Sequence, residues 1–194
     1  MAEPLPDWFM PPAEGWTADD MDHLPPEAPR MELIDGAPIV MSPQSRFHSR
    51  VIRRLTNALE EQAPTGLMAD EELTTTLDKY QRPEPDIVVY KDREAEQEDW
   101  YEATSIPPED VVLVVEVESP ESVFRDREVK PGKYAAAGIP HFWRVVWENG
   151  RAVVHVYELD ATTRGYVAMG IFRDRLELQV PFPIEVNLKK LVRN

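Results

Sequence analysis

The stretch VVLVVEV, residues 111–117, decides the predicted fold. Five of its seven residues are valine. Such a run favours a strand at the centre of a sheet, where both faces are buried. Glu116 interrupts the run with a carboxylate. An ionised carboxylate in a dry interior costs several kcal/mol, so Glu116 should be partnered, neutralised or bound to a cation.

A second carboxylate is expected close to Glu116. Asp86 follows Pro85 and directly precedes the apolar run 87–90, so it lies where a strand begins. A charged residue at a strand end is usually exposed. If the two strands are neighbours, however, Asp86 and Glu116 would converge as a hard divalent cation requires. Glu118 projects to the same face as Glu116 in a regular strand, and a cation, arginine or lysine would relieve their repulsion.

A lysine is expected beside these acids. Asp126, Lys130 and Tyr134 are spaced four apart and share one face if the segment is helical. Lys130 is then the natural cation for the acidic pair. The alternatives are an exposed pair between Lys130 and Asp126, or Lys133 as the cation one turn further on.

The surrounding sequence predicts a mixed α/β fold. Asp35-Gly36 and Asn149-Gly150 are typical of two-residue turns, and each predicts a hairpin. Residues 48–62 repeat apolar side chains at helical spacing. Further strands are expected at 72–77, 86–90, 142–146, 152–157, 166–172 and 175–179, the last two completing the sheet.

Two shorter helices are expected. Thr17 and Asp20 resemble a capped helix start, with an end near residue 24. Residues 124–137 are helical up to the capping Gly138, but Pro131 interrupts the pattern. The regular helix is therefore expected to begin at Pro131, with Lys130 just outside it.

Composition narrows the class of protein. The chain has 194 residues, 42% apolar content, no cysteine and no apolar run long enough for a membrane span. We expect residues 1–15 to be extended or disordered and residues 16–194 to form one domain. The N-terminus lacks the pattern of a secretory signal, so we expect a cytoplasmic protein.

The net charge of −15 argues against nucleic acid as a partner, because phosphate contacts normally come from a basic surface. Four arginines nevertheless crowd one short stretch, which forms either a local basic face or a solvated helix face. They are Arg46, Arg50, Arg53 and Arg54.

Taken together, these motifs resemble the Uma-two family of endonucleases, within the PD-(D/E)xK restriction-endonuclease-like superfamily, from about Trp16 onward. The matching elements are Glu32-Leu33-Ile34-Asp35-Gly36, His48, Pro85-Asp86, Val115-Glu116-Val117-Glu118-Ser119-Pro120, Asp126-x-x-x-Lys130-x-x-x-Tyr134 and Gly138-Ile139-Pro140-His141-Phe142-Trp143. The superfamily's usual lysine lies two residues after the glutamate, where this chain has Glu118. A lysine from the following helix takes that place in similar relatives, which maps onto Lys130.

The resemblance implies a restriction-endonuclease-like fold, with a mixed central sheet flanked by helices and an N-terminal hairpin. It also implies hydrolysis of DNA phosphodiester bonds. Asp86, Glu116 and the backbone carbonyl of Val117 would hold one or two Mg²⁺ or Mn²⁺ ions. Lys130 would orient the attacking water or stabilise developing negative charge.

Further roles follow from the same resemblance. Glu32 would complete the metal shell through a water, and Tyr134 would bind substrate. His48 would contact the phosphate or cap its helix. Glu118 would be an outer metal partner or the partner of an arginine.

Two other functions stay open at this point. The domain could be catalytically silent and act in binding or dimerisation, or it could hydrolyse another phosphate compound. A homodimer is expected from the resemblance and from the frequency of such assemblies.

Overall fold

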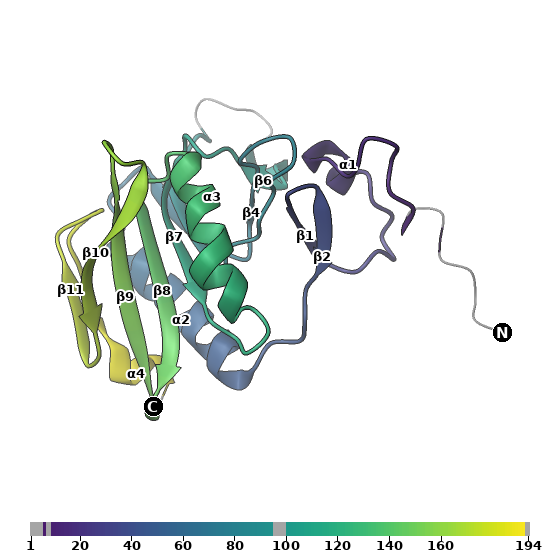
Figure 1. Ribbon diagram of the computed structural model, residues 1–194. Coiled ribbons are helices and arrows are strands. Elements are labelled where there is room, and N and C mark those ends of the chain that lie inside the picture. The colour runs from purple at the N-terminus through teal and green to yellow at the C-terminus, as the bar shows by residue number, and fades with distance from the viewer. Residues whose placement is uncertain (1–5, 7–8, 95–99, 193–194) are drawn as a thin grey trace.

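Six strands form the central sheet of the computed structural model, which describes residues 6, 9–94 and 100–192 (Figure 1). Their order across the sheet is β10-β9-β8-β7-β5-β3. β7 pairs in parallel with β8, and the other neighbours in this sheet are antiparallel. The strands are β3 (Leu67–Glu71), β5 (Ile87–Lys91), β7 (Val111–Val117), β8 (His141–Glu148), β9 (Arg151–Asp160) and β10 (Gly165–Phe172). The predicted mixed α/β fold is confirmed.

β7 lies inside the sheet and is covered on both faces. Leu113, Val115 and Val117 pack into one apolar cluster, which also contains residues of the helix α2 (Arg46–Gln62). Val114 packs into a second cluster on the opposite face. Glu116 alternates with Val115 and Val117, so it lies on the same side as Val114. Its 1% exposure confirms that the carboxylate is buried.

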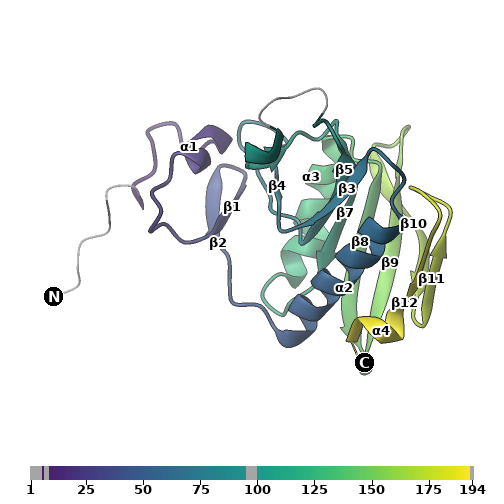
Figure 2. The same cartoon turned by 180° about the vertical axis from the view of Figure 1, so that it is seen from behind.

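Helices cover the two faces of the sheet. α2 lies on one face beside the short C-terminal helix α4 (Leu188–Val192), as Figure 2 shows. The helix α3 (Lys130–Ala136) lies on the other face (Figure 1). Helical spacing buries Val51, Ile52, Leu55 and Leu59 of α2 against the sheet, as the sequence predicted.

The helix around Pro131 differs from the prediction. A π-helix, η3 (Arg125–Val129), runs directly into α3, and the amide of Lys130 donates to the carbonyl of Arg125. Pro131 has no N–H to donate, so the chain changes its hydrogen-bonding pattern here instead of ending the helix. Lys130 therefore lies within the helix, and the expectation that it stands outside was wrong.

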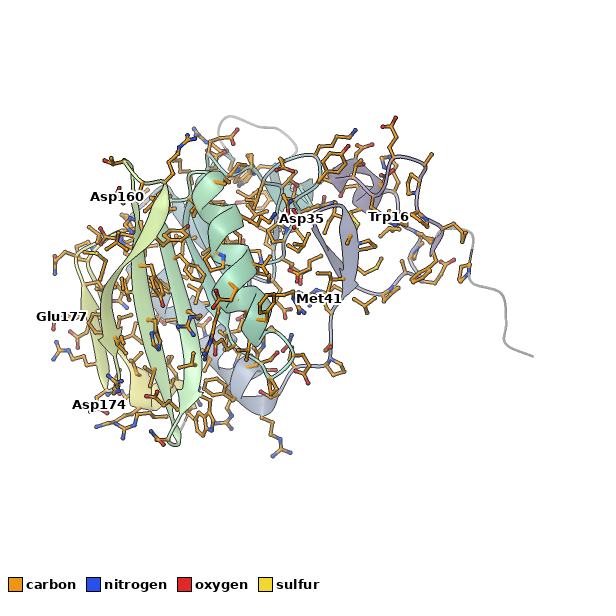
Figure 3. The ribbon with its side chains drawn as sticks, viewed as in Figure 1. Trp16, Asp35, Met41, Asp160, Asp174 and Glu177 are labelled. Carbon is orange, nitrogen blue, oxygen red and sulfur yellow. The ribbon has the colours of Figure 1, made fainter. Side chains whose placement is uncertain are left out.

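The N-terminal hairpin consists of β1 (Met31–Ile34) and β2 (Ala37–Val40), with positive φ angles of 52° and 71° at its turn residues Asp35 and Gly36. Figure 3 shows Asp35 on the side of the hairpin that faces α3. Its carboxylate pairs with the ammonium of Lys133. Leu33 and Arg82 also exchange two backbone hydrogen bonds, of 3.0 and 2.8 Å. These contacts fix the hairpin against the segment that leads into β5.

Two strand predictions were wrong. β3 lies at 67–71, whereas the expected strand at 72–77 is reduced to β4 (Thr74–Thr75), which pairs with β6 (Ser105–Ile106). A positive φ of 56° at Glu72 separates β3 from β4. The segment expected to complete the sheet instead forms β11 (Arg175–Leu178), which pairs with β12 (Ile184–Asn187) in a separate sheet. That pair buries Leu176 and joins the cluster of α2.

The remaining elements are short. α1 (Ala18–Asp22) carries the predicted capping box of Thr17 and Asp20, and η2 (Trp100–Glu102) is a single 3₁₀ turn. Most of residues 1–8 lie outside the described residues. The extended lead-in at 1–15 and the single domain at 16–194 stay predictions. Within the described ranges, no helix is long and apolar enough to cross a membrane.

Candidate functional site

Asp86 and Glu116 lie at neighbouring positions of the central sheet. Asp86 directly precedes β5, and the antiparallel register pairs Ile87 with Val115. The next residues along the two strands are therefore Asp86 and Glu116. Both line one small pocket, with about 20 Å³ of free volume, which is room for about one water molecule or ion. The pocket is also lined by His48, Asp126 and Lys130.

Asp86 is held through one of its two oxygens. Oδ2 accepts a hydrogen bond of 2.6 Å from the amide of Val117 and lies 3.1 Å from Nε2 of His48. Within the described part of the chain, Oδ1 has no hydrogen-bond donor. One oxygen thus fixes the carboxylate and the other is left for a ligand.

Glu116 is contacted by a hydroxyl and an ammonium. Tyr134 donates to Oε1 at 2.6 Å, and Nζ of Lys130 lies 3.1 Å from the same oxygen. Burial raises the pKa of Glu116 well above its ordinary value, while the charge of Lys130 opposes that shift. Tyr134 is itself fully buried, and burial beside Glu116 raises its pKa. Tyr134 therefore stays a neutral hydrogen-bond donor to the carboxylate.

Lys130 stands between three acids. Its Nζ lies 2.9 Å from Oε2 of Glu32, 3.1 Å from Glu116 and 3.9 Å from Oδ1 of Asp126. Burial lowers the pKa of Lys130, but Glu116, Glu32 and Asp126 raise it by more, so the net direction is upward. The side chain is therefore an ammonium. Of the two lysines considered from the sequence, Lys130 reaches the acids, whereas Lys133 pairs with Asp35.

Glu32 reaches the site from the hairpin. It is fully buried in β1, and Oε1 lies 3.2 Å from Nε of Arg125. Its contact with Lys130 places it in the same group of charges as Glu116. The hairpin thus contributes a carboxylate to the centre of the molecule.

Asp126 is a site residue that the sequence did not identify as one. It is 1% exposed, and Oδ2 accepts a hydrogen bond from the hydroxyl of Ser122. Oδ1 is buried and has no hydrogen-bond partner among the residues that the structure describes. Burial raises the pKa of Asp126 to about 6, and the charge of Lys130 opposes the shift. The available signal was its position one turn before Lys130.

Glu118 lies outside the lining of the pocket and pairs with arginines. Its oxygens accept hydrogen bonds of 2.6 and 2.8 Å from Arg127 and a further one from Arg144. These hydrogen bonds keep the pKa of Glu118 below its ordinary value even though burial opposes this. The structure thus agrees with the arginine-partner alternative.

His48 does not cap α2. The cap is Ser45, whose Oγ accepts a hydrogen bond of 3.2 Å from the amide of His48. The imidazole instead lies against Asp86, and its Nδ1 is buried without a hydrogen-bond partner in the part of the chain that the structure describes.

The charges around the pocket are unequal. Four buried carboxylates share two cationic side chains: Glu32, Asp86, Glu116 and Asp126 face Lys130 and Arg125. Among the residues that the structure describes, no three acidic or imidazole groups already form a metal-binding cluster. Lys130 stands where their negative charges meet.

The sheet order, its flanking helices and the buried acidic pocket define a mixed α/β protein of nuclease fold. A model of the Uma2 family, described as "Putative restriction endonuclease", matches residues 18–190. The chain belongs to this family.

A solved structure supports the fold. It is the crystal structure of "a putative nuclease belonging to DUF820" from Anabaena variabilis ATCC 29413, with 19% sequence identity and a TM-score of 0.66. The similarity covers 91% of this chain and 97% of that one. No curated protein matches the chain.

Proposed function

We propose that this chain is a divalent-metal-dependent endonuclease that hydrolyses phosphodiester bonds in DNA. The observation that supports it most is the convergence of Asp86 and Glu116 on one pocket, with the ammonium of Lys130 at 3.1 Å from Glu116. Membership of a family described as restriction endonucleases favours the same activity.

The donor set fits Mg²⁺ or Mn²⁺. Both ions prefer carboxylate oxygens, and Oδ1 of Asp86 has no hydrogen-bond donor among the described residues. The excess of acids over cationic side chains also favours an added positive charge. A bound ion would polarise the phosphate and lower the pKa of a bound water.

The chain's own residues have separable roles. Asp86 and Glu116 hold the ion, together with the carbonyl of Val117, whose amide already fixes Asp86. Lys130 stabilises negative charge that develops on the phosphate. Tyr134 is fully buried against Glu116, so we assign it to positioning that carboxylate instead of binding substrate.

Three other site residues complete the proposal. His48 positions Asp86, which it contacts at 3.1 Å, and lines the pocket where a phosphate would approach. Glu32 holds Lys130 and would contact the ion only through a water. Glu118 orders Arg127 and Arg144. We further propose a cytoplasmic location and a homodimer.

The test is nicking of supercoiled plasmid DNA with Mg²⁺ or Mn²⁺. Wild type should convert the plasmid to open circles, EDTA should stop the reaction, and Asp86→Asn should abolish it. Asp110→Asn is the matched control, since Asp110 is equally buried but pairs with Arg93 away from the pocket. Asp110→Asn should nick like wild type.

A catalytically silent domain is the second candidate. It is favoured by the position of Lys130, whose ammonium already lies between Glu32 and Glu116 where it competes with a metal ion for Glu116. Purified wild type that binds DNA or forms dimers but nicks no plasmid with either metal, over a range of salt concentrations, would support this candidate against the nuclease.

A further inference from the structure

Asp126 has an unexplained oxygen. The residue is buried and Ser122 donates to Oδ2, while Oδ1 has no hydrogen-bond partner in the described ranges 6, 9–94 and 100–192. The closest cation is Nζ of Lys130 at 3.9 Å, which is too long for a hydrogen bond. Leaving a buried charged oxygen unsatisfied is costly, so such a group calls for a partner.

Asp126 lines the same pocket as Asp86 and Glu116. Asp126 lies in the π-helix η3, an element that is uncommon and recurs at functional sites. Asp126 and Lys130 both line the pocket that contains Asp86 and Glu116. A third carboxylate from a different element thus faces the same small volume.

The charge balance points to the kind of ligand. Four buried acids, Glu32, Asp86, Glu116 and Asp126, lie beside two cationic side chains, Lys130 and Arg125, which leaves an excess of acidic groups. An anion would worsen this excess, and an apolar ligand would leave it unchanged. A divalent cation would offset it while giving Oδ1 of Asp126 a partner.

We propose that Asp126 is a third carboxylate ligand of the divalent cation in the pocket of Asp86 and Glu116. This inference rests on the proposed function, since it concerns the same ion. Lys130 lies between these acids, so its ammonium and the ion compete for Glu116. The competition predicts weak metal binding, which each additional carboxylate strengthens.

The test is direct Mn²⁺ binding, measured by electron paramagnetic resonance as the loss of the free-ion signal, without DNA. Asp126→Asn keeps the volume of the side chain and an oxygen that can accept from Ser122. It should bind Mn²⁺ at least about tenfold more weakly than wild type, because losing even an indirect metal contact typically has that effect. Asp110→Asn is the control and should bind like wild type.

The outcomes separate this inference from the proposed function. If Asp86→Asn loses Mn²⁺ while Asp126→Asn binds it as wild type does, the role of Asp126 is refuted and the metal site stands. If wild type binds no Mn²⁺, the metal-dependent function is itself refuted. Circular dichroism checks folding, and Asp126→Ala, which removes both oxygens, should repeat the loss if Asp126→Asn is unfolded.

Discussion

Replacing Lys130 with methionine tests the electrostatics of the site. The ammonium is 3% exposed and lies within 4 Å of Glu32, Glu116 and Asp126, at 2.9, 3.1 and 3.9 Å. Lys130→Met keeps most of the side-chain volume but removes the positive charge. The three carboxylates are then left buried with Arg125 as the remaining cation in contact with Glu32.

The expected cost follows from that geometry. Removing one partner of a buried ion pair typically destabilises a protein by about 3–5 kcal/mol. With an m value of about 2 kcal/mol per molar urea, the midpoint of urea unfolding should fall by roughly 1.5–2.5 M at pH 8. Circular dichroism during urea titration measures this midpoint.

The stability that Lys130→Met loses relative to wild type should depend on pH. Burial already raises the pKa of Glu116, and removing Lys130 raises it further. An acid whose pKa is higher in the folded state than in the unfolded state does not destabilise the protein below its unfolded pKa. Its destabilising effect grows as the pH rises through the folded pKa. Lys130→Met should therefore be most unstable at pH 8 and closest to wild type near pH 5.

Lys133→Met is the matched control. Lys133 lies on the same helix, but its pair with Asp35 is partly exposed, so its loss should cost less than about 1 kcal/mol. Equal costs for the two variants at pH 8, or a Lys130→Met deficit that does not shrink toward pH 5, would refute the view that Lys130 compensates buried charge.

Glycine and histidine positions give further predictions. Gly150→Ala should lower the free energy of unfolding by about 1 kcal/mol in urea titrations, because the φ of Gly150 is +80°. Gly132→Ala should raise the same free energy by up to about 1 kcal/mol, because Gly132 lies in α3 with open space around it. Burial lowers the pKa of His141, so wild type should lose stability as the pH falls through the ordinary histidine pKa. Between pH 7.5 and 5.5, His141→Gln should lose less stability than wild type does.

The buried carboxylate could be predicted because its signal is local. Glu116 lies within a run of valines, and the energetic cost of its burial does not depend on knowing its neighbours. Asp86 required one assumption, that β5 and β7 are adjacent, and the register confirms it. The hairpin turns were also local, since Asp35-Gly36 and Asn149-Gly150 adopt the positive φ angles that these residues tolerate.

Other features depend on contacts that the sequence does not show. β3 has the sequence LMADE, without clear alternation, and is a strand because it pairs with β5. β11 has an ordinary strand pattern, but its partner is β12 rather than the central sheet. An exposed ion pair with Lys130 was one alternative for Asp126, whereas its side chain is buried at the pocket that Asp86 and Glu116 also line.

The acidity of the chain bears on how DNA would bind under the proposed function. A phosphate that approaches the pocket meets more carboxylates than cationic side chains, so its binding is opposed electrostatically. A divalent ion would offset this local imbalance, which means that the ion and the phosphate would strengthen each other's binding to an equal degree. A net charge of −15 therefore does not conflict with a nuclease, provided that the metal ion contributes the attraction that a basic surface gives other DNA-binding proteins.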